Sequence, residues 1–455
     1  MSDTIAAIAT GGVVSAIGIL RVSGDDTLSI IDRVFRPVSG RKMSESPNRQ
    51  LVYGSMLDSD GTELDICLCT ITRGPGSYTG EDTAELQCHG SPTVLRQGLE
   101  ALFRAGARQA GPGEFSKRAF LNGRMDLTQA EAVIDIIHAE TPEAAKNAVG
   151  QLSGAILRKT DEIYASLVEI CSHYHAVLDY PDEDIEDFQL KDYASTLDNA
   201  IASLSALESS FQRGRIMTEG VRAAIIGRPN AGKSSLLNAL LGYERAIVTD
   251  VAGTTRDTIE ERVRLGNVLL RLTDTAGIRE TDDRIEKMGV DRALSAAETA
   301  DLVIAVFDGS APLTEEDHDA IRAAECCDKR IAVINKADCP LVVTADVLTD
   351  CFPEICIISA KEHAGLDALE AAVAKLFPSP NAPVGEILTN ARQADAVTRA
   401  LESLRAAKNA MELGVTPDAV LTEAENAMSA LGELTGKTTR EDVTNRIFSR
   451  FCVGK

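Results

Sequence analysis

The chain has 455 residues, of which 44% are hydrophobic and 25% are charged, and its formal net charge is −23. A chain of this length exceeds what one hydrophobic core serves, so we expect about two to four domains. The acidic balance excludes general charge attraction to nucleic acid, so any RNA binding must use a local basic patch or a partner protein.

The sequence also bounds the cellular context. No apolar run approaches the roughly 18 residues of a membrane span, and the N-terminus lacks the basic and apolar segments of a secretory signal. We therefore predict a cytoplasmic protein with no membrane and no DNA partner. The ten cysteines contain no Cys-x-x-Cys, which favours buried reduced thiols over a structural zinc site.

Residues 1–120 alternate short apolar runs with turn signals, a pattern typical of a small α+β domain. We expect strands at 17–22, 51–54 and 66–71, and a helix at 94–103.

Residues 121–213 change to helical spacing, with apolar residues three and four positions apart. Helices are expected at 152–178 and 193–211, separated by an acidic loop at 182–187. Helical spacing returns in 381–455, so we predict a discontinuous all-α domain whose two halves flank an inserted domain.

The inserted domain, residues 214–380, begins with a phosphate-binding loop. Gly227-Arg228-Pro229-Asn230-Ala231-Gly232-Lys233-Ser234 follows an apolar strand at 223–226 and precedes a helix at 235–241. In that context backbone N–H groups face phosphates. Lys233 then reaches the β- and γ-phosphates, and the Ser234 hydroxyl ligates Mg²⁺.

A second nucleotide segment, Asp274-Thr275-Ala276-Gly277, follows an apolar run at 268–272. Open α/β sheets bind ligands at the carboxyl ends of their strands. We therefore expect Asp274 to hold the Mg²⁺ shell and the Gly277 N–H to approach the γ-phosphate. Between the two segments, Thr255 lies in a predicted switch loop and is the expected Mg²⁺ ligand of the GTP state.

Two further segments select the base. Asn335-Lys336-Ala337-Asp338 follows the strand at 331–334, and Ser359-Ala360-Lys361 follows the strand at 355–358. The Asp338 carboxylate can accept from guanine N1–H and its exocyclic amino group, a pair of donors that adenine lacks. The ordered segments predict a GTPase.

One position differs from Ras-type GTPases, which place a water-orienting Gln directly after the Asp-x-x-Gly segment. Here Ile278 stands there and cannot hydrogen-bond. Glu286 and Arg279 are the nearby candidates for positioning water, and the transition-state charge needs another source of compensation.

The chain resembles the MnmE (TrmE) family of tRNA-modification GTPases over essentially its whole length. The resemblance rests on the terminal Phe451-Cys452-Val453-Gly454-Lys455, on Gly80-Glu81-Asp82, and on 112–116 and 118–122, together with the nucleotide segments. It implies a multidomain α/β protein with an N-terminal α+β folate-binding and dimerising domain, a discontinuous helical domain and a Ras-like P-loop GTPase domain.

The resemblance also implies partners and chemistry. Family members form homodimers and work with the FAD-dependent protein MnmG (GidA). Together they install an aminomethyl or carboxymethylaminomethyl group on C5 of the tRNA wobble uridine, using 5-formyl- or methylene-tetrahydrofolate. By the same resemblance, K⁺ takes the place of an arginine finger, Glu286 orients the water, and Cys452 is the chemical residue of the tail.

These implications give full sets of expected site residues. The K⁺ ligands are Asn230, Thr249, Val251 and Thr254. The Mg²⁺ ligands are Ser234, Thr255 and Asp274. The GTP contacts are Asn230, Ala231, Gly232, Lys233, Ser234, Ser235, Thr249, Thr255, Asp274, Thr275, Gly277, Asn335, Lys336, Asp338, Ser359, Ala360 and Lys361.

The folate contacts implied by the resemblance are Arg21, Glu85, Arg124 and Lys455. Arg124 stands where the family often has Lys, and residues 9–16 lack the family's Pro-Pro-Gly-Arg-like segment. Arg keeps the charge but reaches differently. A structural alternative for Arg21 and Glu85 is an ion pair within the domain.

Two functional alternatives stay open. One is a binding switch, such as a ribosome-assembly GTPase, with no modification chemistry. The other is a folate-dependent one-carbon transferase that carries a regulatory GTPase domain, in which the tail only plugs the folate site.

Overall fold

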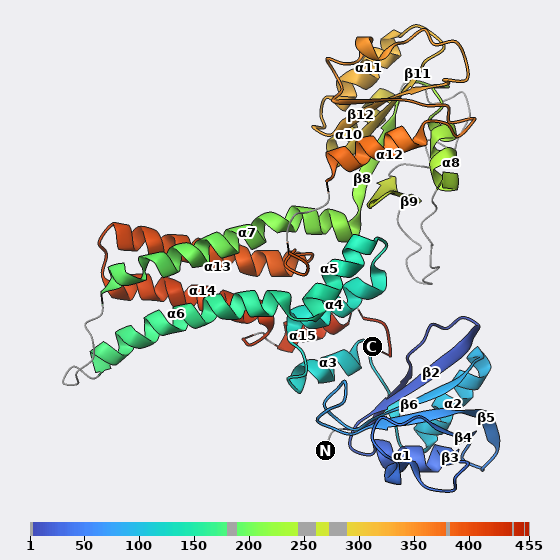
Figure 1. Ribbon diagram of the computed structural model, residues 1–455, viewed down its shortest axis with the longest axis vertical. Helices are drawn as coiled ribbons and strands as arrows, with labels where there is room; N and C mark the ends of the chain where they lie inside the picture. The colour runs from blue at the N-terminus through green and yellow to red at the C-terminus, as the bar shows by residue number, and fades with distance from the viewer. Residues whose placement is uncertain are drawn as a thin grey trace. The chain divides into compact units, whose positions relative to one another are not determined.

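The computed structural model describes residues 3–179, 189–243, 261–272, 289–378, 383–438, 441–449 and 451–454. The chain folds as two compact units (Figure 1). Unit 1 comprises Met1–Ile134, Gly150–Leu204 and Asp395–Lys455, and unit 2 comprises Asp135–Val149 and Ser205–Ala394. The predicted boundaries at 120, 213 and 380 stay predictions.

Unit 1 contains a seven-stranded sheet of order β3-β4-β5-β6-β2-β1-β7, in which only β1 and β7 pair in parallel. The strands are β1 (Ile5–Ile8), β2 (Ser15–Ser23), β3 (Phe35–Pro37), β4 (Val52–Leu57), β5 (Glu63–Thr72), β6 (Thr83–Gly90) and β7 (Arg108–Gln109). The alternation of apolar and polar residues gives the sheet one buried face, which packs on α1 (Thr27–Val34) and α2 (Pro92–Arg104).

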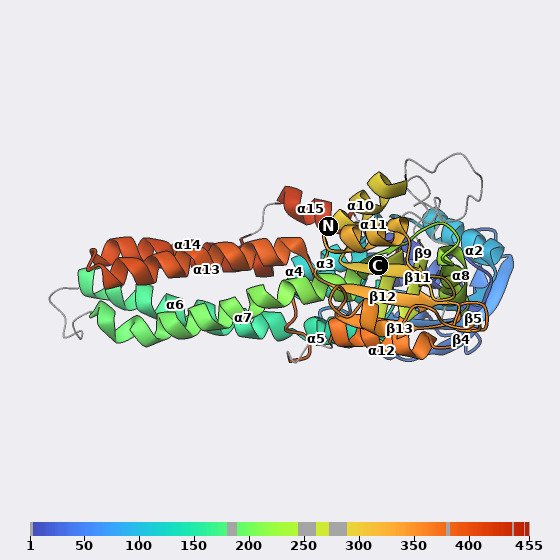
Figure 2. The same cartoon turned by 90° about the horizontal axis from the view of Figure 1, so that it is seen from above.

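The helical part of unit 1 is built on long helices that run side by side (Figures 1 and 2). It comprises α6 (Ala155–Asp179), α14 (Pro417–Thr435), the first part of α7 (Ala194–Glu219) and most of α13 (Ala391–Glu412). Ion pairs such as Lys437–Asp161, at 2.7 Å, join segments far apart in the sequence. The predicted association of the two helical segments is confirmed within this unit.

Three short helices connect the sheet and the bundle of unit 1: α3 (Glu114–Leu121), α4 (Leu127–His138) and α15 (Glu441–Phe448). A small apolar cluster of Leu127, Ala130, Phe448 and Phe451 fixes α15 and the following tail against α4. Phe120 adds its ring to this cluster, with its centroid 6.2 Å from that of Phe448. The C-terminal tail is therefore anchored by aromatic packing.

Unit 2 contains a six-stranded sheet of order β13-β12-β11-β8-β10-β9, parallel except for β9. The strands are β8 (Val221–Ile226), β9 (Glu261–Leu265), β10 (Val268–Leu272), β11 (Leu302–Asp308), β12 (Arg330–Asn335) and β13 (Glu354–Ile357). The central parallel strands are apolar on both faces because helices cover both.

Helices α8 (Lys233–Tyr243) and α12 (Leu366–Leu376) pack on one face of this sheet, and α10 (Gly289–Thr299) and α11 (Glu315–Ala324) pack on the other. Unit 2 also contains α5 (Pro142–Leu152) up to its residue 149. The unit is thus a three-layer α/β fold, which confirms the fold class predicted for the inserted domain. Single turns of 3₁₀ helix lie at Met43–Glu45, Leu190–Tyr193 and Ala345–Val347.

The helix predicted at 193–211 is longer than expected. It runs to Glu219, and Gly220, with φ of 84°, ends it before β8 begins. A left-handed glycine is a common helix terminator because it has no Cβ to clash. Among the described residues, no helix combines the length and apolar character needed to cross a bilayer.

Candidate functional site

The phosphate-binding loop lies between β8 and α8, as predicted. Gly227 has φ of 144°, and a Cβ there would lie 2.3 Å from the carbonyl oxygen of Val306 on the neighbouring strand. Only glycine fits that approach. Asn230 also has positive φ, at 61°, a conformation that Asn adopts more readily than most residues.

Lys233 begins α8 and turns its side chain back into the loop. Its Nζ donates to the carbonyl oxygens of Gly227, at 2.7 Å, and Arg228, at 2.8 Å. Burial lowers the pKa of Lys233, because the ammonium is partly removed from water. The charge sits over the loop where phosphates would lie. Ser234 is half-buried and Ser235 exposed on the same helix.

Asn335, at the end of β12, joins the phosphate loop to the second base-reading segment. Its Nδ2 donates to the carbonyl oxygen of Ala231 at 3.0 Å, and its Oδ1 accepts from the Ala360 N–H at 3.0 Å. Asn335 is 2% exposed. A Cβ at Gly232 would lie 2.0 Å from Asn335 Nδ2, so only glycine is tolerated at this position of the loop. Two segments that lie far apart in the sequence are thus held together by one buried amide.

Asp338 faces the other base-reading segment across the exposed end of the sheet. Its Oδ1 accepts from the Ser359 hydroxyl at 2.7 Å, and the Lys361 ammonium lies 3.9 Å from Oδ2. The hydroxyl of Ser359 is the main cause that lowers the pKa of Asp338. The carboxylate is therefore ionised and held in place for two donors of a base.

Three charged residues that the sequence did not single out brace this site. Asp308 ends β11, and its carboxylate accepts from Lys336 Nζ at 2.6 Å while lying 3.8 Å from the guanidinium of Arg228. Arg228 also lies 3.2 Å from Asp317, which is 1% exposed and caps α11 through Thr314. Burial opposes ionisation of Asp308, but Lys336 and Ser310 lower its pKa to about 2.

Part of the predicted nucleotide site lies outside the described residues. That part comprises Thr249, Val251, Thr254, Thr255, Asp274, Thr275, Gly277, Arg279 and Glu286. Among the residues that are described, no three His, Cys, Asp or Glu side chains cluster as a metal site. The described portion brings together the phosphate loop and both base-reading segments.

A second site surrounds the C-terminal tail in unit 1. Val453 forms an isolated β-bridge with Pro112, and the Gly113 N–H donates to the carbonyl oxygen of Cys452 at 3.2 Å. Gly454 has φ of 100°, and a Cβ there would lie 2.3 Å from the carbonyl oxygen of Ile8 on β1. These contacts hold the backbone of Cys452 and Val453 beside Pro112 and Gly113, and the Cys452 side chain is exposed.

Arg21 and Glu85 lie opposite each other on β2 and β6 and form an ion pair at 2.9 Å. Arg21 also donates to the carbonyl oxygen of Gly454 at 3.3 Å, and its guanidinium lies 5.7 Å from the ring centroids of Tyr78 and Phe115. The structure thus brings two of the predicted folate residues to the tail. Lys455 lies outside the described residues.

Arg124, the third predicted folate residue within the described chain, donates from Nε to the carbonyl oxygen of Ser77 at 3.1 Å. The neighbouring Asn122 donates to the carbonyl oxygen of Thr79 at 2.7 Å. Both bonds hold the loop that follows β5. Tyr78 of this loop shares a hydrogen bond with Ser116 at 2.8 Å.

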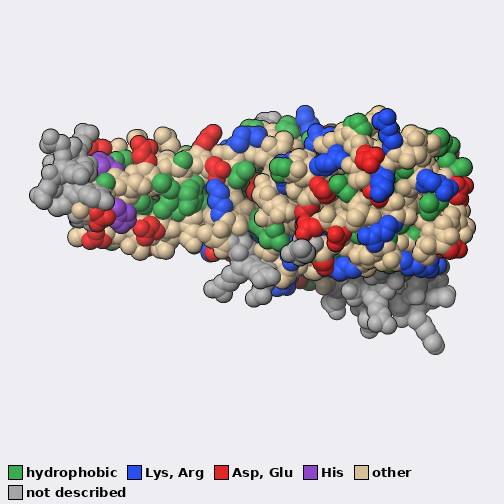
Figure 3. Space-filling model, turned by 90° about the horizontal axis from the view of Figure 1, so that it is seen from below, with side chains coloured by type: hydrophobic (Ala, Val, Ile, Leu, Met, Phe, Trp, Pro, Cys, Tyr) green, Lys and Arg blue, Asp and Glu red, His purple; other side chains and the backbone are tan. Residues whose placement is uncertain are grey.

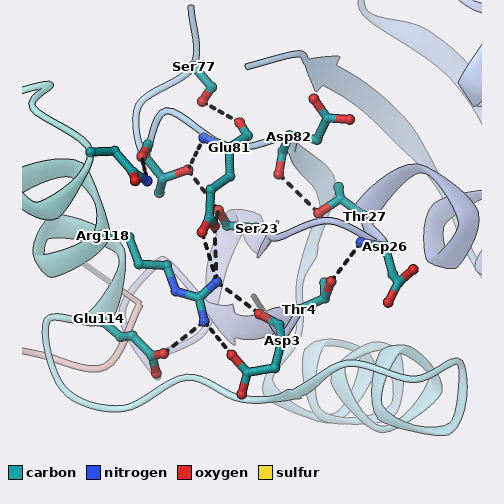
Figure 4. A network of polar contacts seen from close by, with 12 residues as sticks. Asp3, Thr4, Ser23, Asp26, Thr27, Ser77, Glu81, Asp82, Glu114 and Arg118 are labelled. Carbon is teal, nitrogen blue, oxygen red and sulfur yellow. Dashed lines mark hydrogen bonds and ion pairs between the residues drawn. The ribbon is translucent and has the colours of Figure 1, made fainter. Parts of the chain in front are cut away.

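A partly buried ionic network is centred on Arg118 (Figure 4). Arg118 of α3 contacts Glu81 at 3.0 Å, Glu114 at 3.0 Å and Asp3 at 2.8 Å. Burial alone would raise the pKa of Glu114, but hydrogen bonds from Arg108, the Gly111 N–H and Arg118 lower it to about 2. Three carboxylates, Asp3, Glu81 and Glu114, are thus paired with two arginines, Arg108 and Arg118, so most of their charge is compensated.

Comparison with known proteins decides the family. Residues 127–452 match the MnmE helical domain, and residues 4–124 match the N-terminus of the GTP-binding protein TrmE. This chain belongs to the MnmE family. The helical-domain match begins before the six-stranded sheet and ends after it, in keeping with an inserted domain.

Full-length relatives agree with the family match. The tRNA modification GTPase MnmE of Symbiobacterium thermophilum is 43% identical over 455 residues, which covers 100% of this chain and 99% of the relative. That of a Roseiflexus species is 43% identical over 468 residues, with the same two shares. The crystal structure of Era in complex with MgGDPNP and 16S ribosomal RNA is 28% identical, covers 40% of this chain and 66% of that chain, and has a TM-score of 0.27.

Membership in the MnmE family confirms three predictions. The recognised family was correct, the fold class was correct, and the enzyme class is that of a GTP hydrolase. That Asn335 and Asp338 read the guanine base in this activity stays a prediction. Individual site residues, ions and partners stay predictions.

Proposed function

We propose that this chain hydrolyses GTP to drive modification of the tRNA wobble uridine at C5. The observation that carries this proposal is the way the tail is held: Arg21 and the Gly113 N–H donate to the carbonyl oxygens of Gly454 and Cys452 and leave the cysteine side chain exposed. A regulatory GTPase that only switches binding partners needs no thiol fixed in this way. The printed names of the relatives, tRNA modification GTPases, support the same activity.

In the proposed reaction, the described residues of unit 2 bind and orient GTP. Lys233 stabilises the β- and γ-phosphates, and Asp338, fixed by Ser359, reads the guanine edge. Lys336 and Ala360 border the base from either side. Asn335 holds the two loops at a constant separation, so that phosphates and base are read together.

Bound cations would supply electrostatic compensation for the charge that develops on the transferred phosphoryl group. For Mg²⁺ we propose Ser234, Thr255 and Asp274, and for K⁺ we propose Asn230, Thr249, Val251 and Thr254. Two described members support these roles. Ser234 stands on the first turn of α8, and Asn230 is an exposed residue of the phosphate loop with positive φ. Glu286 is the proposed residue that orients water, with Arg279 beside it.

At the tail, Cys452 is the proposed chemical residue. Arg21 and Glu85 would hold a tetrahydrofolate together with Arg124 and Lys455, and the folate would supply a one-carbon unit. A guanidinium bordered by Tyr78 and Phe115 suits a ligand that has a flat ring and carboxylates. We also propose that the chain forms a homodimer, works with the FAD-dependent partner MnmG and acts in the cytoplasm.

Two measurements test the proposal. GTP turnover by the full-length protein should be several-fold faster in KCl than in NaCl at equal ionic strength, and equal rates would remove the cation role. Mass spectrometry of tRNA nucleosides from cells lacking the protein should show unmodified wobble uridine. Unchanged nucleosides would favour the regulatory switch instead.

A further inference from the structure

The negative charge of the chain is unevenly distributed. Residues 1–124 contain 13 Lys and Arg against 14 Asp and Glu, whereas the whole chain contains 46 against 69. Within this part, residues 33–57 carry five basic residues and one acidic residue, Glu45. Figure 3 shows a similar contrast on one face: the long helices at the left carry more acidic than basic side chains, and basic side chains are frequent at the right. The N-terminal part is therefore where this acidic chain can attract an anionic partner.

Four cations lie in two loops that pack together beside the outermost strands of the seven-stranded sheet. Arg41, Lys42 and Arg49 belong to the loop between β3 and β4, and Arg73 belongs to the loop that follows β5. The Arg73 guanidinium donates to two carbonyl oxygens of segment 44–46, at 2.7 and 3.3 Å, and so joins the two loops. We call these four residues the basic edge.

The positive charge of the basic edge is not cancelled by nearby carboxylates. Arg41 and Lys42 are exposed, and neither forms an ion pair with an acidic side chain in the part of the chain that the structure describes. The guanidinium groups of Arg49 and Arg73 donate to backbone carbonyl oxygens, which carry no formal charge. Cations in this state can bind phosphates without first giving up a carboxylate partner.

The loop that carries three of these cations is fixed before any ligand binds. Met43 is 0% exposed and anchors the loop in the core, and the Asp32 carboxylate accepts from both the N–H and the hydroxyl of Ser44, at 3.0 and 2.6 Å. Arg49 has φ of 62°, a conformation that costs a non-glycine residue about 1–3 kcal/mol, and its N–H donates to the carbonyl oxygen of Ile71 at 2.8 Å. A preorganised loop loses less conformational entropy on binding.

The basic edge is connected to the site at the tail. Arg73 begins the loop that continues to Tyr78, and the ring of Tyr78 lies 5.7 Å from the Arg21 guanidinium. One loop therefore borders both places. We propose that the basic edge binds backbone phosphates of an RNA stem, independently of its sequence. This inference rests on the proposed function, in which tRNA is the substrate, and it assigns the surface that holds the RNA backbone.

Charge spacing favours RNA over an acidic protein as the partner. A nucleic acid duplex presents one negative charge per roughly 1.7 Å of its axis. An extended acidic peptide presents at most one charge per about 3.3–3.6 Å. A compact group of four cations therefore meets more negative charge on a duplex, and it releases more condensed counterions when it binds there.

The test is fluorescence anisotropy of the full-length protein with a fluorescein-labelled tRNA transcript, measured over a range of salt concentrations. Arg41→Gln combined with Lys42→Gln should reduce the slope of log K against log salt by about 1.8, because each phosphate contact with a duplex contributes about 0.9. At about 0.1 M salt the double variant should bind on the order of tenfold more weakly, and the difference should shrink as the salt concentration rises.

Matched variants separate the basic edge from the effect of net charge. Lys191→Gln combined with Arg213→Gln removes the same two charges from exposed positions outside the N-terminal sheet, and it should leave the slope unchanged. Arg41→Lys combined with Lys42→Arg keeps both charges and should retain the wild-type slope. GTP turnover and the thermal midpoint by circular dichroism should be the same in all of these variants, since none of the substituted side chains is buried.

The outcomes are distinct. Unchanged RNA binding in the Arg41→Gln, Lys42→Gln variant, or an equal loss in the Lys191→Gln, Arg213→Gln variant, overturns the assignment and leaves the proposed function standing. Poly-L-glutamate should displace the labelled RNA far less than unlabelled RNA does at the same concentration of negative charge. Equal displacement would overturn the proposal in favour of an acidic protein partner. If the wild-type protein hydrolyses GTP but binds no RNA, both this surface and direct action on tRNA fail.

Discussion

The buried amide of Asn335 donates to the carbonyl oxygen of Ala231 at 3.0 Å. Its other amide atom accepts from the Ala360 N–H, also at 3.0 Å, so both ends of the side chain are used. The Ala231 carbonyl belongs to the phosphate loop, and the Ala360 N–H belongs to the second base-reading segment. One side chain therefore fixes the separation between the two segments that we propose hold GTP.

We expect Asn335→Asp to weaken nucleotide binding by roughly 10- to 100-fold. The substitution keeps the shape but removes the donor and places a carboxylate against the Ala231 carbonyl in a buried setting, which costs about 1–3 kcal/mol. Titration with a fluorescent GDP analogue measures the effect. Asn409→Asp, on the exposed surface of α13, should bind as the wild type does. Equal affinity of both variants would contradict the bridging role.

Asp338→Asn should reduce the preference for GTP over xanthosine triphosphate. The amide of the variant has one donor and one acceptor in place of two acceptors. Guanine presents two donors to this position, so one contact is lost, whereas xanthine has a carbonyl in place of the amino group and can accept from the new donor. Ser359 would still hold the side chain through its 2.7 Å contact. We expect GTP affinity to fall by at least about tenfold, with xanthosine triphosphate less affected. Competition binding with the two nucleotides checks this, and an unaltered ratio would remove Asp338 from base reading.

Asp308→Asn should weaken nucleotide binding several-fold with little change in kcat. Lys336 and Ser310 lower the pKa of the carboxylate to about 2, so it is ionised near neutral pH, and it restrains Lys336, which we propose lies beside the base. The amide loses the charge that attracts Lys336 and Arg228. Asp319→Asn removes an equivalent charge from an exposed pair with Arg322 and serves as the control. A lower kcat at unchanged KM would show that Asp308 acts on the chemical step instead.

The sequence predicted the nucleotide fold well because its strands are continuous apolar runs. Strands β8, β10 and β12 were all expected within a few residues of where they lie. Their residues are mostly buried and apolar, with only single polar positions such as Arg222 and Arg271, so the signal is strong. Lys233 begins the helix that follows β8 and its loop, and Asn335 is the last residue of β12, so the places of both residues could be inferred from the strands.

The N-terminal sheet was harder to predict. The strand β6 (Thr83–Gly90) was not expected, since half of its residues face an open side of the sheet and are polar, among them Glu85. The ion pair of Glu85 with Arg21 was one of the alternatives that the sequence left open. No local pattern indicates that Gly454 lies against Ile8, because that contact joins opposite ends of the chain. The contacts of Asp308 were missed because its partners, Lys336 and Arg228, come from two other loops and no local pattern links them to it.

Glu114→Gln should destabilise unit 1 at pH 7, and the difference should disappear in acid. The folded pKa of about 2 lies below the ordinary value of 4.5, so the carboxylate stabilises the fold fully above pH 4.5 and loses this effect as pH falls towards 2. After allowance for solvent screening we expect about 1–2 kcal/mol at pH 7.

Urea unfolding followed by tyrosine fluorescence measures this effect, since all of the seven tyrosines except Tyr243 belong to unit 1. Glu100→Gln, in an exposed pair with Arg104 on α2, is the matched control and should change the midpoint little. A Glu114→Gln difference that persists undiminished at pH 3 would mean that the ionised pair is not what stabilises this network.

Gly454→Ala should release the tail and abolish tRNA modification while GTP hydrolysis continues. The residue has φ of 100°, and an added Cβ would lie 2.3 Å from the Ile8 carbonyl oxygen, a collision with backbone that cannot move aside. Gly414→Ala is the matched control, because Gly414 also has positive φ, at 69°, but a Cβ there meets nothing within 4 Å. It therefore carries the backbone strain without the collision.

Hydrogen exchange of residues 451–454 and of the Gly113 amide, which donates to the carbonyl oxygen of Cys452, should accelerate in Gly454→Ala and not in Gly414→Ala. Nucleoside analysis of tRNA from cells carrying each variant then reports the chemistry. Normal modification with a released tail would show that the position of Cys452 is not needed for it.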